Sequence, residues 1–253
     1  MASPIIFYSI PSRKGCWSLH TLKIRYALNY KGLPFRTEWV EYPDIEKKCK
    51  EIGAEPTDTK EDGSPLYTLP VISDPSTGKV ISDGPKIAKY LDEAYPDTPK
   101  LYPPGTEATQ KHAMAQLFGK AAPALRPMVV PCVVHILGEG SKPYFRATRE
   151  KALGCTLEEK IPKGDDRKVR LEQGREAFEA FLGRFKDKSG KETPFLLGES
   201  PCFADFSVAG FLQWIRLTLG DESDVWKAIE GWSDGKVVKY LEDLRKHEGD
   251  PRA

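Results

Sequence analysis

The sequence predicts two domains of different class, an α/β N-terminal domain followed by an all-α C-terminal domain. Strand-like and helix-like patterns alternate over the first hundred residues. The segment PDTPKLYPPG then holds four prolines in ten residues at 96–105, which is typical of a linker. Beyond it, apolar residues recur with helical spacing and little strand pattern remains. We therefore expect a domain at 1–96, a linker at 97–104 and a helical domain at 105–253.

The N-terminal pattern begins in the order βαβα. Residues 5–10 form an apolar run that is typical of a buried strand. Residues 18–30 place apolar side chains with helical spacing, and Gly32 follows as a C-terminal stop. The stretch FRTEWVEY at 35–42 alternates like a second strand, and IEKKCKEIGA at 45–54 indicates a short helix.

A ββα unit completes this domain. The runs LPVI and KVIS flank the turn-forming DPSTG, so residues 69–82 predict a β-hairpin. DGPKIAKYLDEAY then predicts a helix, with Asp83 at its N-terminus and Pro85 in its first turn, where proline is tolerated.

Helical patterns dominate the second half of the chain. We expect helices at 110–125 and 167–186, a buried central helix at 203–219 and shorter helices within 225–245. Residues 139–166 carry no clear pattern and are left unassigned.

Composition excludes several classes of protein. The chain has 38 Lys+Arg against 37 Asp+Glu, interspersed, so neither nucleic acid nor an anionic membrane is expected as the main partner. The apolar stretch 129–137 falls short of the ~20 residues that span a bilayer. Five dispersed cysteines predict neither a disulfide framework nor a metal site. We expect a cytoplasmic protein with reduced thiols.

The stretch GCWSLHTLKIRYAL at 15–28 concentrates chemistry-bearing side chains where a strand passes into a helix. Cys16, Ser18, His20 and Thr21 lie within six residues. An α/β protein can place a nucleophile or bind an anion at such a junction. Ser18 is also a preferred helix-capping residue, so this stretch alone does not separate catalysis from capping.

The whole pattern resembles the cytosolic glutathione transferases. In LPVI, Pro70 would be the family's cis-proline. ISDGPKIAKYLDE resembles the acidic-residue-then-serine element at the start of the third helix, and GESPCFADFSVAGFL resembles the capping box of the central C-terminal helix. The resemblance implies a thioredoxin-like, glutathione-binding N-terminal domain. WSLHTLKIRYALNYKGLPF and EWVEYPDIEKKCKEIGA are similar, more closely, to fungal relatives of the bacterial lignin β-etherases, a serine-type class.

The resemblance makes Ser18 the expected catalytic residue. The family's residue lies seven positions before an arginine of the first helix, here Arg25. A thiol with a pKa near ~8.5 is mostly protonated at neutral pH, and the thiolate is the nucleophile. One hydroxyl donor and a helix N-terminus would stabilise that thiolate. Cys16, as a thiol transferase nucleophile, and His20, as a base, are the rivals.

The resemblance also implies contacts to the rest of glutathione. The backbone of Leu69, before Pro70, would pair with the cysteinyl residue, and Asp83 would bind the γ-glutamyl ammonium. The N–H of Gly84 would bind the neighbouring carboxylate. Lys47 and Lys50 are equal candidates for the glycyl carboxylate.

Two residues depart from the family pattern. Gly84 stands where serine is usual, which removes one hydroxyl from the γ-glutamyl site. Cys202 stands where the capping box has serine or threonine, so Asp205 should carry most of that cap.

The resemblance implies a glutathione transferase that acts in detoxification, attacking hydrophobic or aromatic electrophiles, with etherase-like or glutathione-adduct cleavage as a finer expectation. A non-catalytic carrier of aromatic molecules and a regulatory relative are the alternatives. A homodimer is expected by analogy. Residues around Leu117, Phe118, Leu125 and Met128 are candidate walls of the electrophile site, but helical spacing of this kind is more often that of a core, so none is assigned to the site.

Overall fold

A four-stranded sheet organises the N-terminal half of the computed structural model, which describes residues 3–250 and 252. The strands are β1 (Ile5–Ser9), β2 (Phe35–Trp39), β5 (Val71–Asp74) and β6 (Lys79–Ser82), in the spatial order β2-β1-β5-β6. β1 is parallel to β2 and antiparallel to β5, and β5 is antiparallel to β6. The second predicted strand ends three residues early, because a 3₁₀ turn begins at Tyr42.

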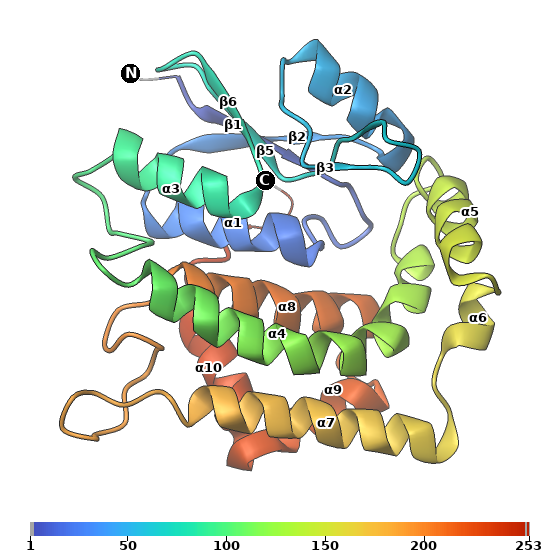
Figure 1. The fold of residues 1–253 in the computed structure, drawn as a ribbon, viewed down its shortest axis with the longest axis vertical. Helices are drawn as coiled ribbons and strands as arrows, with labels where there is room; N and C mark the ends of the chain where they lie inside the picture. The colour runs from blue at the N-terminus through green and yellow to red at the C-terminus, as the bar shows by residue number, and fades with distance from the viewer. Residues whose placement is uncertain (1–2, 251, 253) are drawn as a thin grey trace.

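Helices α1 (Leu19–Tyr30) and α3 (Gly84–Ala94) lie between this sheet and the C-terminal helices, whereas α2 (Ile45–Glu51) lies beside the sheet (Figure 1). A second, two-stranded sheet pairs β3 (Asp58–Thr59) with β4 (Pro65–Leu66), which we did not expect. Two residues per strand are too few to produce a readable alternation.

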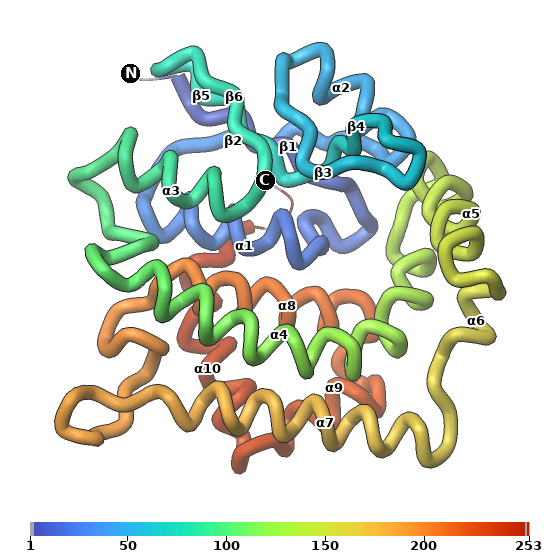
Figure 2. Tube along the Cα trace, viewed as in Figure 1, coloured from blue at the N-terminus to red at the C-terminus, as the bar shows by residue number. Residues whose placement is uncertain are grey.

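Helices dominate the described residues of the C-terminal half, with only isolated β-bridges at Lys186–Glu192 and Phe195–Gly198, which confirms the predicted fold class (Figures 1 and 2). The unassigned region 139–166 holds two helices, at Lys142–Leu153 and Leu157–Lys160. The predicted helix 167–186 begins earlier and ends at Leu182, before Gly183. The elements are α4 (Glu107–Val129), η2 (Val130–His135), α5 (Lys142–Leu153), α6 (Leu157–Lys160), α7 (Gly164–Leu182), α8 (Phe203–Leu219), α9 (Asp224–Gly231), η3 (Trp232–Gly235) and α10 (Lys236–Arg245).

Helix α4 continues past the predicted end at residue 125, although it contains Pro123 and Pro127. Pro127 has no N–H for the carbonyl four residues earlier, which is that of Pro123. The Arg170 guanidinium donates to this carbonyl at 3.1 Å. The run Glu107–His135 is long and apolar enough to cross a membrane by composition, but half of its most apolar window is buried in the fold, as in a core helix.

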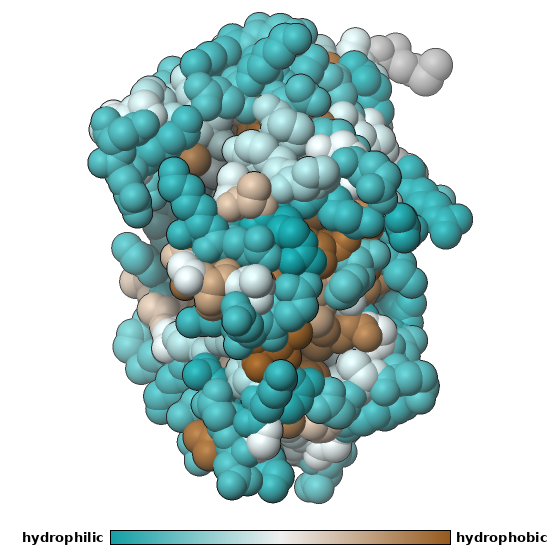
Figure 3. Space-filling view, turned by 90° about the vertical axis from the view of Figure 1, so that its right-hand side faces the viewer, coloured by the Kyte–Doolittle hydropathy of each residue, from teal (hydrophilic) through white to brown (hydrophobic). Residues whose placement is uncertain are grey.

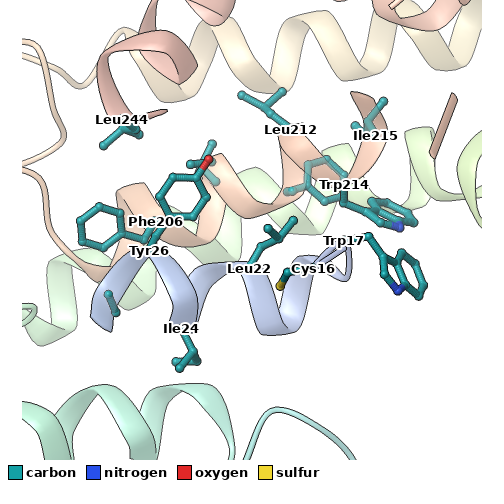
Figure 4. Close-up of a cluster of buried hydrophobic side chains, with 14 of the residues drawn as sticks. Cys16, Trp17, Leu22, Ile24, Tyr26, Phe206, Leu212, Trp214, Ile215 and Leu244 are labelled. Atoms are coloured by element: carbon teal, nitrogen blue, oxygen red, sulfur yellow. The ribbon is translucent and has the colours of Figure 1, made fainter. Parts of the chain in front are cut away.

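The two halves share one apolar core, in which α1 packs on α8. The rings of Tyr26 and Phe206 stack with centroids 6.0 Å apart, and Leu22 and Leu212 lie in the same cluster (Figure 4). At Gly210 the backbones approach closely, because a Cβ there would lie 3.0 Å from the Leu19 carbonyl oxygen. Only glycine fits this contact without displacement.

Polar contacts fasten the linker and the C-terminal segment to the first domain. Asp92 of α3 accepts hydrogen bonds from the Lys31 ammonium at 2.7 Å and from the linker N–H groups of Leu101 and Tyr102. The Arg25 Nε donates to the Glu248 carbonyl at 3.0 Å. Residues 247–250 thus form a C-terminal strap against α1.

The cap of α8 forms as expected from Asp205. Its Oδ2 accepts from the Cys202 N–H at 2.8 Å, and its Oδ1 accepts from the Tyr240 hydroxyl at 2.8 Å. Burial raises the pKa of Asp205, and these donors oppose that rise.

Candidate active site

Three segments with predicted site residues meet at one edge of the four-stranded sheet. Tyr8, near the end of β1, pairs with Val71, the first residue of β5, and Val71 pairs with Ser82, the last residue of β6. The turn that leads to α1, the loop before β5 and the start of α3 therefore share this edge. The register thus brings the segments that carry Ser18, Leu69–Pro70 and Asp83–Gly84 to the same edge of the sheet.

Ser18 is the N-cap residue of α1, but its hydroxyl makes no capping hydrogen bond. Its backbone is extended, with φ −67° and ψ 129°. The Ser18 carbonyl starts the helix, accepting from Leu22 N at 2.8 Å and from the Thr21 hydroxyl at 3.2 Å. Because the side chain does not serve the helix, its O–H remains a donor for a ligand at the helix N-terminus.

The environment of Cys16 argues against a role as the catalytic nucleophile. The thiol is fully buried, with Ser9 Oγ at 3.6 Å and Thr21 Oγ1 at 3.5 Å. Burial raises the pKa of Cys16, which opposes formation of a reactive thiolate. Thr21 is likewise buried and is engaged by Cys16 and by the Ser18 carbonyl.

His20 lies in the first turn of α1, where its outer surface is exposed but protein atoms crowd around the imidazole. Its surroundings desolvate the imidazole and lower its pKa to about 4, and the nearby Lys23 and Arg126 add to this effect. The imidazole is therefore neutral at physiological pH. Arg126 belongs to α4, so this end of α1 adjoins the C-terminal domain.

The Leu69–Pro70 peptide bond is cis, as expected from the sequence. At the start of α3, Asp83 has a φ of 78°, which is strained for a residue other than glycine. Its carboxylate accepts from Lys86 N at 3.4 Å and thereby caps α3. Such strain often marks a functional position, where the surrounding structure maintains it.

Sequence reasoning missed Lys23, whose side chain lies against Gly84. A Cβ built on Gly84 would lie 2.5 Å from Lys23 Cε and 2.9 Å from Lys23 Nζ. The ammonium therefore occupies the space into which a serine side chain would extend. The only sequence signal was the unusual glycine, because nothing in the sequence shows that α1 and α3 meet at these residues.

The two lysine candidates for the glycyl carboxylate differ in their partners. Lys50 is paired with Glu46 at 2.7 Å and lies over the Tyr67 ring. Lys47 is exposed, and among the described residues it has no ion pair.

A cavity of about 510 Å³ lies against the second half of α4, between it and α5–α6. Its walls include Phe118, Pro127 and Leu153, and cations stand among them. Of the candidate wall residues only Phe118 lines it; Leu117, Leu125 and Met128 are buried in the core, because α4 turns that face toward α7 and α8. Apolar surface gathers at mid-height of the molecule between polar surfaces (Figure 3).

A second cavity, of about 460 Å³, is formed by α7, α10 and the segment between α7 and α8. It contains none of the predicted site residues. Among the described residues no cluster of three or more metal-ligating side chains could hold a metal ion.

Comparisons with known proteins agree with this arrangement. A family model described as glutathione S-transferase, N-terminal domain, matches residues 17–94, and one described as glutathione S-transferase, C-terminal domain, matches 108–247. The glutathione S-transferase-like protein ustS of Aspergillus flavus is 34% identical over 241 residues, covering 91% of this chain and 84% of the relative.

Solved structures are similar over nearly the whole chain. A glutathione S-transferase of Ceriporiopsis subvermispora, crystallised in complex with glutathione, is 42% identical with a TM-score of 0.91, covering 99% of this chain and 100% of that one. Glutathione transferase GSTFuA3 from Phanerochaete chrysosporium is 43% identical with a TM-score of 0.88, covering 98% of each chain. This chain belongs to the glutathione S-transferase family.

Proposed function

We propose that this protein is a glutathione transferase in which the Ser18 hydroxyl activates the glutathione thiol. The observation that carries the proposal is the Ser18 side chain itself, which stands at the N-terminus of α1 without capping it. Glutathione as the co-substrate is supported by the family and by similar proteins crystallised in complex with it.

The proposed roles are those that the family resemblance implies, and the shared sheet edge supports them. The Leu69 backbone, before the cis Pro70, pairs with the cysteinyl residue of glutathione. Asp83 accepts from the γ-glutamyl ammonium, and the Gly84 N–H at the start of α3 donates to the adjacent carboxylate. The sulfur then lies near the first turn of α1, where Ser18 O–H and the helix N-terminus stabilise the thiolate.

In the proposed reaction the thiol proton leaves to solvent and the thiolate sulfur forms a C–S bond to an electrophilic carbon of a hydrophobic or aromatic substrate. The displaced group leaves with the electron pair of its broken bond and is protonated by solvent. Ser18 keeps its own proton and donates it as a hydrogen bond to the anionic sulfur. A single such donor contributes roughly one to two orders of magnitude in rate, at ~1.4 kcal/mol for each. Etherase-like cleavage of aromatic ethers or glutathione adducts is the finer form of this proposal, supported by the sequence resemblance.

A carrier of aromatic molecules is the second candidate function, favoured by the open apolar cavity beside α4. A cysteine-type thiol transferase has less support, because the Cys16 thiol is buried with a raised pKa. We further propose that the protein is fungal and cytoplasmic, that it forms a homodimer and that it acts in detoxification. We propose domain boundaries that give an N-terminal domain at 1–96, a linker at 97–104 and a C-terminal domain at 105–253. Sedimentation of the purified chain tests the dimer.

The decisive experiment titrates the ultraviolet thiolate absorbance of bound glutathione against pH in wild type, Ser18→Ala and Cys16→Ala. Wild type and Cys16→Ala should ionise the thiol below neutrality, and Ser18→Ala should require a higher pH. If glutathione binds wild type without a lowered thiol pKa, the serine mechanism is wrong. Tight aromatic binding without turnover would then favour the carrier.

A further inference from the structure

We propose that Lys23 binds the α-carboxylate of the γ-glutamyl residue of glutathione, in place of the serine side chain that α3 lacks. This inference rests on the proposed function and deepens it. It explains why glycine stands at position 84, because the absence of a side chain there leaves room for the Lys23 ammonium from α1. The departure from the family pattern then replaces one anchor with another.

The steric evidence is the strongest. The Lys23 Nζ lies 2.9 Å from the Cβ position of Gly84, closer than real Cβ contacts occur, so a side chain at 84 and this rotamer of Lys23 exclude each other. The ammonium stands where a serine would present its hydroxyl, at the first residue of α3.

The electrostatic evidence is that the Lys23 ammonium has no carboxylate paired with it in the part of the chain that the structure describes. Lys23 is partly buried, and none of the ion pairs or hydrogen bonds among residues 3–250 and 252 engages its ammonium. Burial lowers its pKa, and Asp83 opposes this only from a distance. The positive end of α3 adds to the same field. A carboxylate placed here would satisfy both the ammonium and the helix N-terminus.

The ammonium and the α-carboxylate of the γ-glutamyl residue would then each have an oppositely charged partner. Asp83 takes the γ-glutamyl ammonium, while Lys23 and the Gly84 N–H take the α-carboxylate. A ligand that lacks this carboxylate should gain nothing from Lys23. That difference gives the proposal its test.

The test measures, by calorimetry, the binding of glutathione and of 4-aminobutyryl-cysteinyl-glycine, which lacks only the α-carboxylate. Lys23→Met should weaken glutathione binding about tenfold or more and leave the analogue within about twofold. Lys86→Met is the control, because Lys86 is an exposed cation in the first turn of the same helix. Lys23→Arg should retain most of the affinity.

Gly84→Ser provides an independent check. Alone it should weaken glutathione binding, because the new side chain collides with Lys23; combined with Lys23→Met it should restore binding. Lys23→Met that weakens both ligands equally, or that strengthens glutathione binding, would overturn the proposal. Failure of the wild type to bind glutathione would instead overturn the proposed function.

A different observation carries a second inference: we infer that the cavity beside α4 selects apolar anions, such as aryl carboxylates or phenolates. It too rests on the proposed function and names the class of ligand that this cavity binds. The cavity is lined by Arg126, Arg149 and Lys160 and by no acidic residue. Its other lining residues are all apolar.

These three cations are not neutralised from within the fold. None has an ion pair among the described residues; the Arg149 guanidinium instead lies over the Phe145 ring at 4.9 Å. Two acidic residues of α5 and α6 are engaged elsewhere. Arg146 holds Glu150 and Glu158 at 2.7 Å each. A cavity of this size accommodates a bicyclic aromatic ligand.

A matched pair of ligands isolates the charge. We expect 2-naphthoate to bind about tenfold more tightly than 2-naphthamide, and Arg126→Gln combined with Arg149→Gln to abolish this preference while naphthamide binding is unchanged. Lys111→Gln, an exposed α4 lysine outside the cavity, is the control. Equal binding of the two ligands to wild type, or a preference that survives the double substitution, would refute the inference whatever the thiol site does.

Discussion

The Lys31 ammonium lies 2.7 Å from the Asp92 carboxylate, and the Lys31 side chain is completely buried. This pair joins the end of α1 to α3, and Asp92 also accepts the linker N–H groups. Desolvation lowers the pKa of Lys31, and Asp92 opposes it. One carboxylate thus fixes both helices of the proposed glutathione site and the start of the second domain.

Asp92→Asn should lower the free energy of unfolding by about 3–5 kcal/mol, because it leaves a buried ammonium without its counter-charge. Denaturant unfolding measures this. Asp243→Asn, which breaks an exposed pair with Lys239, should cost under ~1 kcal/mol. If both substitutions lower the free energy of unfolding by similar amounts, the buried pair contributes no more to stability than the exposed one.

Gly210→Ala should destabilise the protein by about 1–3 kcal/mol, because the added methyl pushes against the Leu19 carbonyl oxygen and Lys23 N of α1. Gly119→Ala is the matched control, since a Cβ there meets nothing within 4 Å. Gly119 is an exposed residue inside α4, so Gly119→Ala should instead raise the free energy of unfolding by about 0.5–1 kcal/mol through its higher helix propensity. Thermal or denaturant unfolding of both variants decides the comparison.

The five cysteines should fall into a reactive group and an unreactive group according to their exposure. Cys132 and Cys155 are partly exposed and should react with a disulfide reagent in the native state, whereas Cys16, Cys49 and Cys202 are buried. Burial raises the pKa of Cys49 to about 11, so this thiol is mostly protonated at any pH well below that value. Rapid labelling of Cys16, located by mass spectrometry, would revive the cysteine-type reading.

Removing residues 248–253 should destabilise the first domain, because the buried Arg25 loses the Glu248 and Asp250 carbonyl acceptors. Each buried donor left unsatisfied costs about 1–3 kcal/mol. Unfolding monitored by tryptophan fluorescence measures the loss. Removing residue 253 alone is the control, and equal stability of the two truncated chains would contradict the expected role of the strap.

Much of the fold was readable from the sequence because the strongest signals are local. The alternation of strand and helix, the LPVI–DPSTG–KVIS hairpin and the apolar α8 each follow from spacing within a few residues. Helix α4 was predicted too short because Pro127 usually ends a helix, and the compensating donor, Arg170, lies 47 positions away in sequence.

The candidate site was predictable only where a motif carries it. Ser18, Pro70 and Asp83 come from short motifs, and the structure brings their segments to one edge. Lys23, Arg126 and Arg149 could not be found this way, because their meaning depends on which helices touch. Leu125 and Met128 lie in the core, which is what such spacing more often indicates; helical spacing marks an apolar face without telling core from cavity wall.

The C-terminal strap has a consequence for how such proteins can be recombined. Because residues 247–250 complete the surroundings of α1, the half with the proposed glutathione site is built from residues 1–96 and from this strap. A chimera that takes its first domain from one relative and its second from another inherits α1 and its strap from different parents. Exchanges that move 1–96 together with the last seven residues should therefore yield folded hybrids more often than exchanges at the linker alone.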